Sequence, residues 1–183
     1  VTYADPVKSQ VDLLDTQEED ELPDIDKNEI TVNEDSGLYV EIFTAPERSG
    51  SDKDGWMNEM AEKFNREDMQ VNGQDVSVRI RNVTSGLAME YIATGKYVPD
   101  GFSPSNAFWG KMLEADDVRV QTVAERLVGN VPILMFQNDT YDELMKKYGA
   151  LNLKTVVEAT ANGEITMGYT NPYASSTGLN FLI

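Results

Sequence analysis

Small hydroxyl and amide side chains are clustered at four places where the chain is expected to pass from a strand into a helix. The clusters are Thr44; Thr84 and Ser85; Ser103, Ser105 and Asn106; and Ser175, Ser176 and Thr177. In an open parallel sheet such places meet at the carboxyl edge, where ligands bind. Backbone N–H groups at a helix start, the helix dipole and a nearby hydroxyl can satisfy the oxygens of a polar or anionic ligand. We therefore predict that these residues form a ligand-binding site.

A simpler interpretation is that each cluster only caps a helix, because Ser, Thr and Asn are the usual N-cap residues. Their joint placement after four strands favours binding. The cations near these helix starts are Arg48 and Lys53, so an anionic solute would be held chiefly by neutral donors and helix dipoles. A carbohydrate would instead stack on Trp109 or Tyr173, whereas Trp56 is predicted to lie in the core.

The composition excludes several kinds of chemistry. The chain has no Cys and no His, which excludes thiol and imidazole catalysis, the usual zinc sites and disulfides. No glycine-rich nucleotide motif is present, so we predict neither a cofactor nor a metal ion. A hydrolase would need a carboxylate base such as Glu47 or Asp100, and no Ser has an activating partner nearby in sequence. We therefore predict a protein that is not an enzyme.

The 183-residue chain is strongly acidic, with 32 Asp and Glu against 15 Lys and Arg and a net charge of −17. Residues 1–38 contain 12 acidic and 2 basic residues, so residues 1–37 are predicted to be a solvated lead-in or linker. A short strand around residues 30–32 remains an alternative, as does a calcium loop through Asp24, Asp26, Asn28 and Asp35, which has Glu29 where a Gly is needed. No basic cluster is present, so nucleic acid is not an expected partner.

From Leu38 onward, strand and helix patterns alternate. Strands are predicted at 38–43, 76–80 and near 97–98, and helices at 56–65, from 82–86 to 94, and around 107–113. This succession predicts an α/β fold with parallel strands joined by right-handed crossovers. Beyond it we expect an edge or crossover strand at 126–136, helices at 139–148 and 152–161, a strand at 164–169 and a helix starting at 179.

Two segments carry a family resemblance, PDGFSPSN at 99–106 and MGYTNPYASSTG at 167–178. From Leu38 to Ile183 the chain resembles a bacterial extracellular solute-binding protein of the type II periplasmic-binding-protein class. The resemblance implies a two-lobed α/β fold with a parallel or mixed sheet flanked by helices. Residues 38–130 would form lobe one, and residues 131–183 the crossing segment and the start of lobe two. It also implies that the second motif contributes ligand contacts from lobe two.

The same resemblance implies an extracellular protein that captures a small polar or anionic solute between its lobes and serves a membrane transporter. It would be anchored to the cell surface as a lipoprotein whose signal peptide the chain lacks. Related sequences resemble those joined to a von Willebrand type A domain at a Gram-positive surface. The alternative is a cell-surface interaction or adhesion module with a vestigial cleft. Because a helix has barely begun at Ile183, we expect lobe two to be incomplete and the chain to associate with itself through it.

Overall fold

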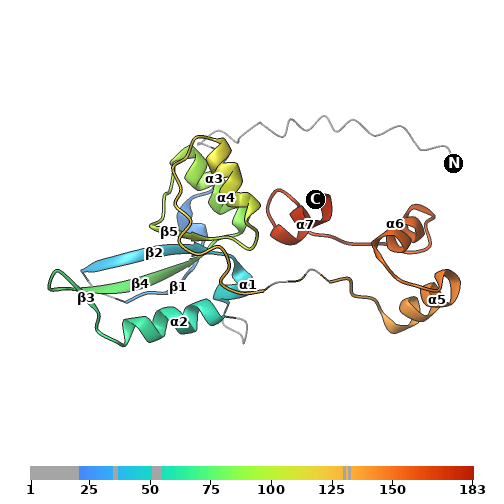
Figure 1. Cartoon of the computed structure of the whole chain (residues 1–183), viewed down its shortest axis with the longest axis horizontal. Coiled ribbons are helices and arrows are strands. Elements are labelled where there is room, and N and C mark those ends of the chain that lie inside the picture. The colour runs from blue at the N-terminus through green and yellow to red at the C-terminus, as the bar shows by residue number, and fades with distance from the viewer. Residues whose placement is uncertain (1–20, 35–36, 51–54, 130, 132) are drawn as a thin grey trace. The chain divides into compact units, whose positions relative to one another are not determined.

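The computed structural model describes residues 21–34, 37–50, 55–129, 131 and 133–183. The chain divides into two compact units, Val1–Val123 and Ala124–Ile183, and each is described by itself (Figure 1). We call them unit 1 and unit 2. The predicted domain boundaries, at residues 37 and 130, remain a hypothesis.

Unit 1 is built on a mixed five-stranded sheet (Figure 1). The strands, in spatial order, are β1 (Ile30–Val32), β4 (Gln74–Asn82), β2 (Leu38–Thr44) and β5 (Gly101–Ser103), and β3 (Gln70–Val71) pairs with β4. β2 is parallel to both β4 and β5, whereas β1 is antiparallel to β4. The predicted α/β class with a mixed sheet flanked by helices is confirmed.

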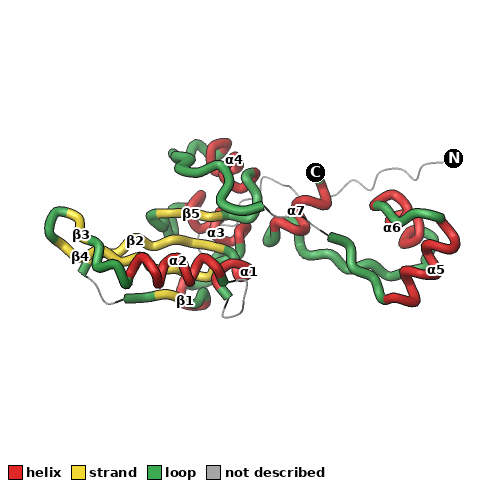
Figure 2. The backbone as a smooth tube through the Cα atoms, turned by 60° about the horizontal axis from the view of Figure 1, so that its bottom comes forward, coloured by secondary structure: helices red, strands yellow, loops and turns green. Residues whose placement is uncertain are grey.

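Helices lie on both faces of this sheet (Figure 2). α2 (Trp56–Asn65) covers one face, and α3 (Ser85–Thr94) covers the other with α4 (Phe108–Ala115) packed against it. The single turn α1 (Pro46–Ser49) follows β2 directly. α3 ends at Thr94, as predicted, and Gly95 follows it in the left-handed conformation at φ 74°.

The alternation of side chains along the strands divides the core in two. On the α2 face, the buried residues are Val32, Met57, Ala61 and Ile80. On the α3 face they are Leu22, Phe43, Val83, Ala88 and Tyr91. Trp56 packs against this core, as predicted, whereas Met60 of the same helix is 52% exposed.

The described part of the predicted lead-in segment, residues 21–34, is part of this fold, so the expectation of a solvated linker is wrong there. Leu22 is buried in the α3-side core, and the carbonyl of Pro23 accepts a hydrogen bond from the Tyr91 hydroxyl at 2.8 Å. The alternative of a short strand is correct, since β1 pairs with β4. The isolated apolar residues of this segment face the core while the charged residues between them face water.

Three strands predicted from the sequence are absent from the described residues at those positions. The third parallel strand is β5 rather than residues 97–98, because Tyr97 packs edge-on against Tyr91 with ring centroids 5.1 Å apart. The described residues of 126–136 and residues 164–169 form no strand. An apolar or alternating run becomes a strand only where another strand pairs with it.

Unit 2 contains three helices, α5 (Asn138–Tyr148), α6 (Leu153–Ala161) and α7 (Ser176–Leu182). Leu144, Val156 and Ala159 are buried. The end of α5 is joined to the segment after α6 through the Glu164 carboxylate. This group accepts hydrogen bonds from Lys147 Nζ at 2.5 Å and from the Tyr148 hydroxyl at 3.0 Å.

Leu22→Ala should destabilise unit 1 by about 2 to 5 kcal/mol, because it opens a cavity between the lead-in segment and the sheet. Thermal or urea unfolding followed by circular dichroism measures this. Leu38→Ala is the matched control, since Leu38 is 39% exposed and should cost far less. Equal effects of the two substitutions would contradict the packing of Leu22.

The pKa of the Glu164 carboxyl should lie below its ordinary value, chiefly because of the hydrogen bond from Lys147. A lowered pKa in the folded state means that this contribution to stability is present above the pKa of the unfolded chain. It is lost as the pH falls through the folded-state pKa. A carbon-detected NMR titration measures the pKa, and Lys147→Met should raise it toward the ordinary value.

The control for that titration is Lys154→Met, which removes the same charge from α6 at a residue outside the Glu164 cluster. An equal rise in the pKa of Glu164 in both variants would show that net charge, rather than this contact, lowers it.

Candidate functional site at the carboxyl edge of the sheet

The parallel register of the sheet places the ends of three strands side by side. Thr44 at the end of β2 is opposite Asn82 of β4 on one side and Ser103 of β5 on the other. The loops and helix starts that follow these strands therefore share one edge. Six of the predicted site residues lie there: Thr44, Thr84, Ser85, Ser103, Ser105 and Asn106.

Three of these side chains have structural roles. The Thr44 side chain is fully buried, and its hydroxyl donates to the Ser103 carbonyl at 3.4 Å. Asn106 accepts from the backbone N–H of Phe108, the first residue of α4, at 2.8 Å, although the N-cap residue of this helix is Ala107. Ser85 is 3% exposed and accepts from the backbone N–H of Ser105 at 3.3 Å. These contacts hold the three loops together.

Thr84 differs from these three residues. It is the N-cap residue of α3, its side chain makes no capping hydrogen bond, and the residue is exposed. Thr84 therefore has the N-cap position without the side-chain hydrogen bond that the cap interpretation expects.

Arg48 is the residue of this edge that the predicted set lacks. Its guanidinium group donates to the Ser103 carbonyl at 2.6 Å, to the Ser103 hydroxyl at 3.2 Å and to the Ser105 hydroxyl at 3.0 Å. Only 9% of the residue is exposed, and Nε has no hydrogen-bond partner among the residues that the structure describes. Burial lowers the pKa of Arg48 from its ordinary value, and the neighbouring Glu47 carboxylate opposes that shift.

Glu47 completes this cluster from the solvent side. Its carboxylate accepts a hydrogen bond from the Ser105 hydroxyl, and the residue is exposed. Ser105 thus lies between a buried cation and an exposed anion. The sequence signal for Arg48 and Glu47 is a pair of opposite charges in the polar segment directly after the first parallel strand.

The other three predicted residues lie in unit 2. Ser175 caps α7, accepting from the Thr177 backbone N–H at 3.3 Å and from the Thr170 hydroxyl at 3.1 Å. Ser176 is 6% exposed. The backbone N–H groups of Ala174 and Ser175 both donate to the Asn171 carbonyl, which closes the Asn-Pro turn.

The aromatic residues near these loops differ in what they can do. Trp109 is 2% exposed and lies in the core, so it is not available to stack on a ligand, and this expectation is wrong. Tyr169 is stacked on Phe181 at 6.0 Å between ring centroids. Tyr173 is 45% exposed and remains available.

Comparison with known proteins decides the family. Residues 48–182 match the family model described as bacterial extracellular solute-binding protein. This chain belongs to that family. The matched segment contains Arg48, Ser103, Ser105 and the turn before α7, and the resemblance predicted from the two sequence motifs is confirmed. No curated protein and no solved structure gives a significant match.

Membership establishes a solute-binding domain of an extracellular protein, in a family that is generally non-enzymatic. None of the helices in the described part of this domain is long and apolar enough to cross a membrane. Among the described residues, no three Asp or Glu side chains gather as they would around a metal ion.

Gly178→Ala should displace the Asn-Pro turn of unit 2, because a Cβ atom there would lie 2.1 Å from the Thr170 carbonyl oxygen and 2.7 Å from Pro172 N. Both are backbone atoms, which cannot give way as a flexible side chain can. Amide hydrogen exchange should become faster at Ala174 and Ser175. Gly168→Ala is the control, since its Cβ atom would meet nothing within 4 Å.

Proposed function

We propose that this chain captures a small polar or anionic solute, without catalysis, in a cleft between two lobes. The captured solute is passed to a membrane transporter. The residues proposed to contact the solute are those at the carboxyl edge of unit 1 and those of the Ser175–Thr177 turn. Anchoring to a Gram-positive cell surface as a lipoprotein belongs to the same proposal.

One observation carries the proposal: the buried Arg48 beside the loop hydroxyl groups at the carboxyl edge of the parallel strands. A buried cation costs free energy unless it is paired or hydrogen-bonded. The guanidinium group is held by neutral oxygens of Ser103 and Ser105. A polarised hydroxyl beside a buried positive charge is suited to the oxygen of a polar or anionic solute.

Identification by native mass spectrometry of what co-purifies with the protein is the direct test. Calorimetry with sulfate, phosphate, molybdate and a set of oligosaccharides then measures affinity. For an anion, Ser85→Ala should weaken binding by about 1 to 3 kcal/mol, because it removes a polar group that orders the edge. Ser176→Ala should cost a similar amount, because it would leave an oxygen of the charged ligand without a hydrogen-bond partner.

For a neutral carbohydrate the order should reverse, with Tyr173→Ala costing more than either serine substitution. Tyr141→Ala is the matched control, since Tyr141 and Tyr173 are both 45% exposed and Tyr141 lies in α5. If no solute co-purifies and none of these compounds binds below about millimolar concentration, a weak limit for capture, solute capture fails. The cell-surface interaction module would then be the better account.

A further inference from the structure

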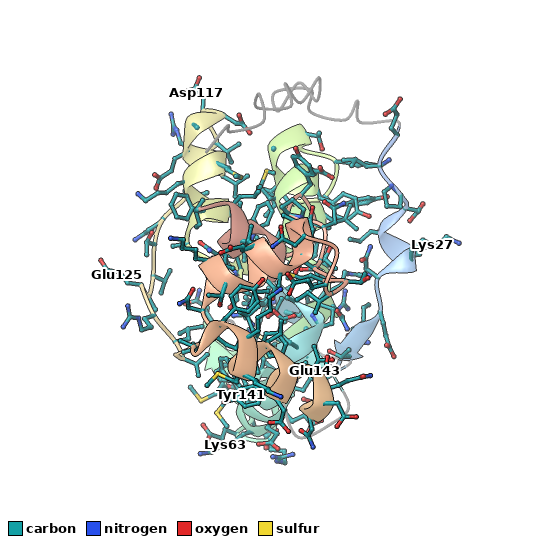
Figure 3. The ribbon with its side chains drawn as sticks, turned by 90° about the vertical axis from the view of Figure 1, so that its right-hand side faces the viewer. Lys27, Lys63, Asp117, Glu125, Tyr141 and Glu143 are labelled. Carbon is teal, nitrogen blue, oxygen red and sulfur yellow. The ribbon has the colours of Figure 1, made fainter. Side chains whose placement is uncertain are left out.

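Arg48 and Arg81 are both buried charged residues of unit 1, but Arg81 is paired with the Glu41 carboxylate, whereas the Arg48 guanidinium group is held by oxygen atoms of Ser103 and Ser105. Lys27, Lys63 and Asp117 are exposed and point outward (Figure 3). Arg48 is 9% exposed, and three of its hydrogen bonds go to β5 and the loop that follows it. Its charge is therefore fixed in place beside Ser105.

Ser105 has a single hydroxyl proton, which it donates in a hydrogen bond to the Glu47 carboxylate. The hydroxyl accepts from Arg48 Nη2 at 3.0 Å and donates to the Glu47 carboxylate. A hydroxyl can donate only one hydrogen bond. An anionic oxygen of a solute can therefore accept a hydrogen bond from the Ser105 hydroxyl only after the Glu47 carboxylate has moved away.

The Glu47 carboxylate is a suitable group to be displaced. Its residue is exposed, so its charge can return to water without a large desolvation cost. It also repels any second anion that approaches the same hydroxyl. The buried Arg48 cannot leave in the same way, because its guanidinium group is held by three oxygen atoms.

We propose that Glu47 is a built-in competitor for anionic solutes at Ser105 and thereby sets the charge selectivity of the site. This inference rests on the proposed function. An anion displaces the Glu47 carboxylate and takes over the Ser105 hydroxyl beside the Arg48 charge. A neutral solute does not compete for the carboxylate's position in this way. Glu47 therefore lowers the binding affinity for anions alone.

The test compares Glu47→Gln with the native chain in calorimetric titrations with sulfate and with maltose. Loss of the competing charge should strengthen sulfate binding about tenfold, the size of one charge-assisted hydrogen bond. Maltose binding should change less than about twofold, a difference well below that of one hydrogen bond. The side-chain Nε–H NMR signal of Arg48 should shift at lower sulfate concentration in the variant.

Two further variants separate contact from charge. Glu67→Gln makes the same change in net charge at an exposed residue beyond α2 and should leave sulfate affinity nearly unchanged. Glu47→Asp keeps the charge but shortens the side chain, so it should weaken the hold on Ser105 and give part of the gain. It also provides the measurement if Glu47→Gln fails to fold.

Sulfate binding that is unchanged or weaker in both Glu47 variants would overturn the inference and make Glu47 a structural partner of Arg48. An equal gain in Glu67→Gln would overturn it too, because net charge would then be the cause. Binding of maltose but of no anion by any variant would reject the inference and leave solute capture standing. Binding of neither compound, with no co-purifying solute, would reject both.

Discussion

The parallel pairing of β2 with both β4 and β5 is the constraint on which unit 1 depends. Parallel strands need crossover connections, and here each crossover begins at the same edge of the sheet. The register, with Leu38 opposite Val76 and Thr44 opposite Asn82, determines which residues lie at that edge. A shift of one residue would turn Ile42 and Phe43 to the wrong cores. The two cores therefore keep the strand ends, and with them the polar loops, in position.

The loops at this edge are held by polar contacts rather than by apolar packing. The Ser85 hydroxyl accepts a hydrogen bond from the backbone N–H of Ser105, and Arg48 joins the turn after β2 to the end of β5. These residues are up to 57 positions apart in the chain. Several hydroxyl groups at this edge, namely those of Thr44, Ser85, Ser103 and Ser105, are thus engaged within the protein. A solute that binds here has to share or displace existing hydrogen bonds. Its affinity therefore depends on how readily the hydrogen bonds of Ser105 are replaced.

The sequence predicts elements best where the signal is local. The bounds of α2 at Trp56 and Asn65 agree with the structure, and so does the end of α3 at Thr94. The role of Leu22 could not be predicted in the same way, since one leucine among acidic residues has no period and its partners lie in β2 and α3. β5 is three residues long, too short for an alternation to be seen. The burial of Arg48 depends on Ser103 and Ser105, which no local pattern connects to it.

The charge of the chain and the chemistry of the candidate site act over different distances. A net charge of −17 repels anions from afar, but exposed charges are largely screened beyond about 8 Å at physiological ionic strength. Within hydrogen-bonding distance of Ser105, the charges among the described residues are those of Arg48 and Glu47, and of these two only Arg48 is fixed by burial. If the site takes an anion, as proposed, the acidic surface governs how fast it arrives and this one pair governs whether it stays. A buried cation is screened far less than the surface around it, so the net charge alone does not exclude an anionic solute.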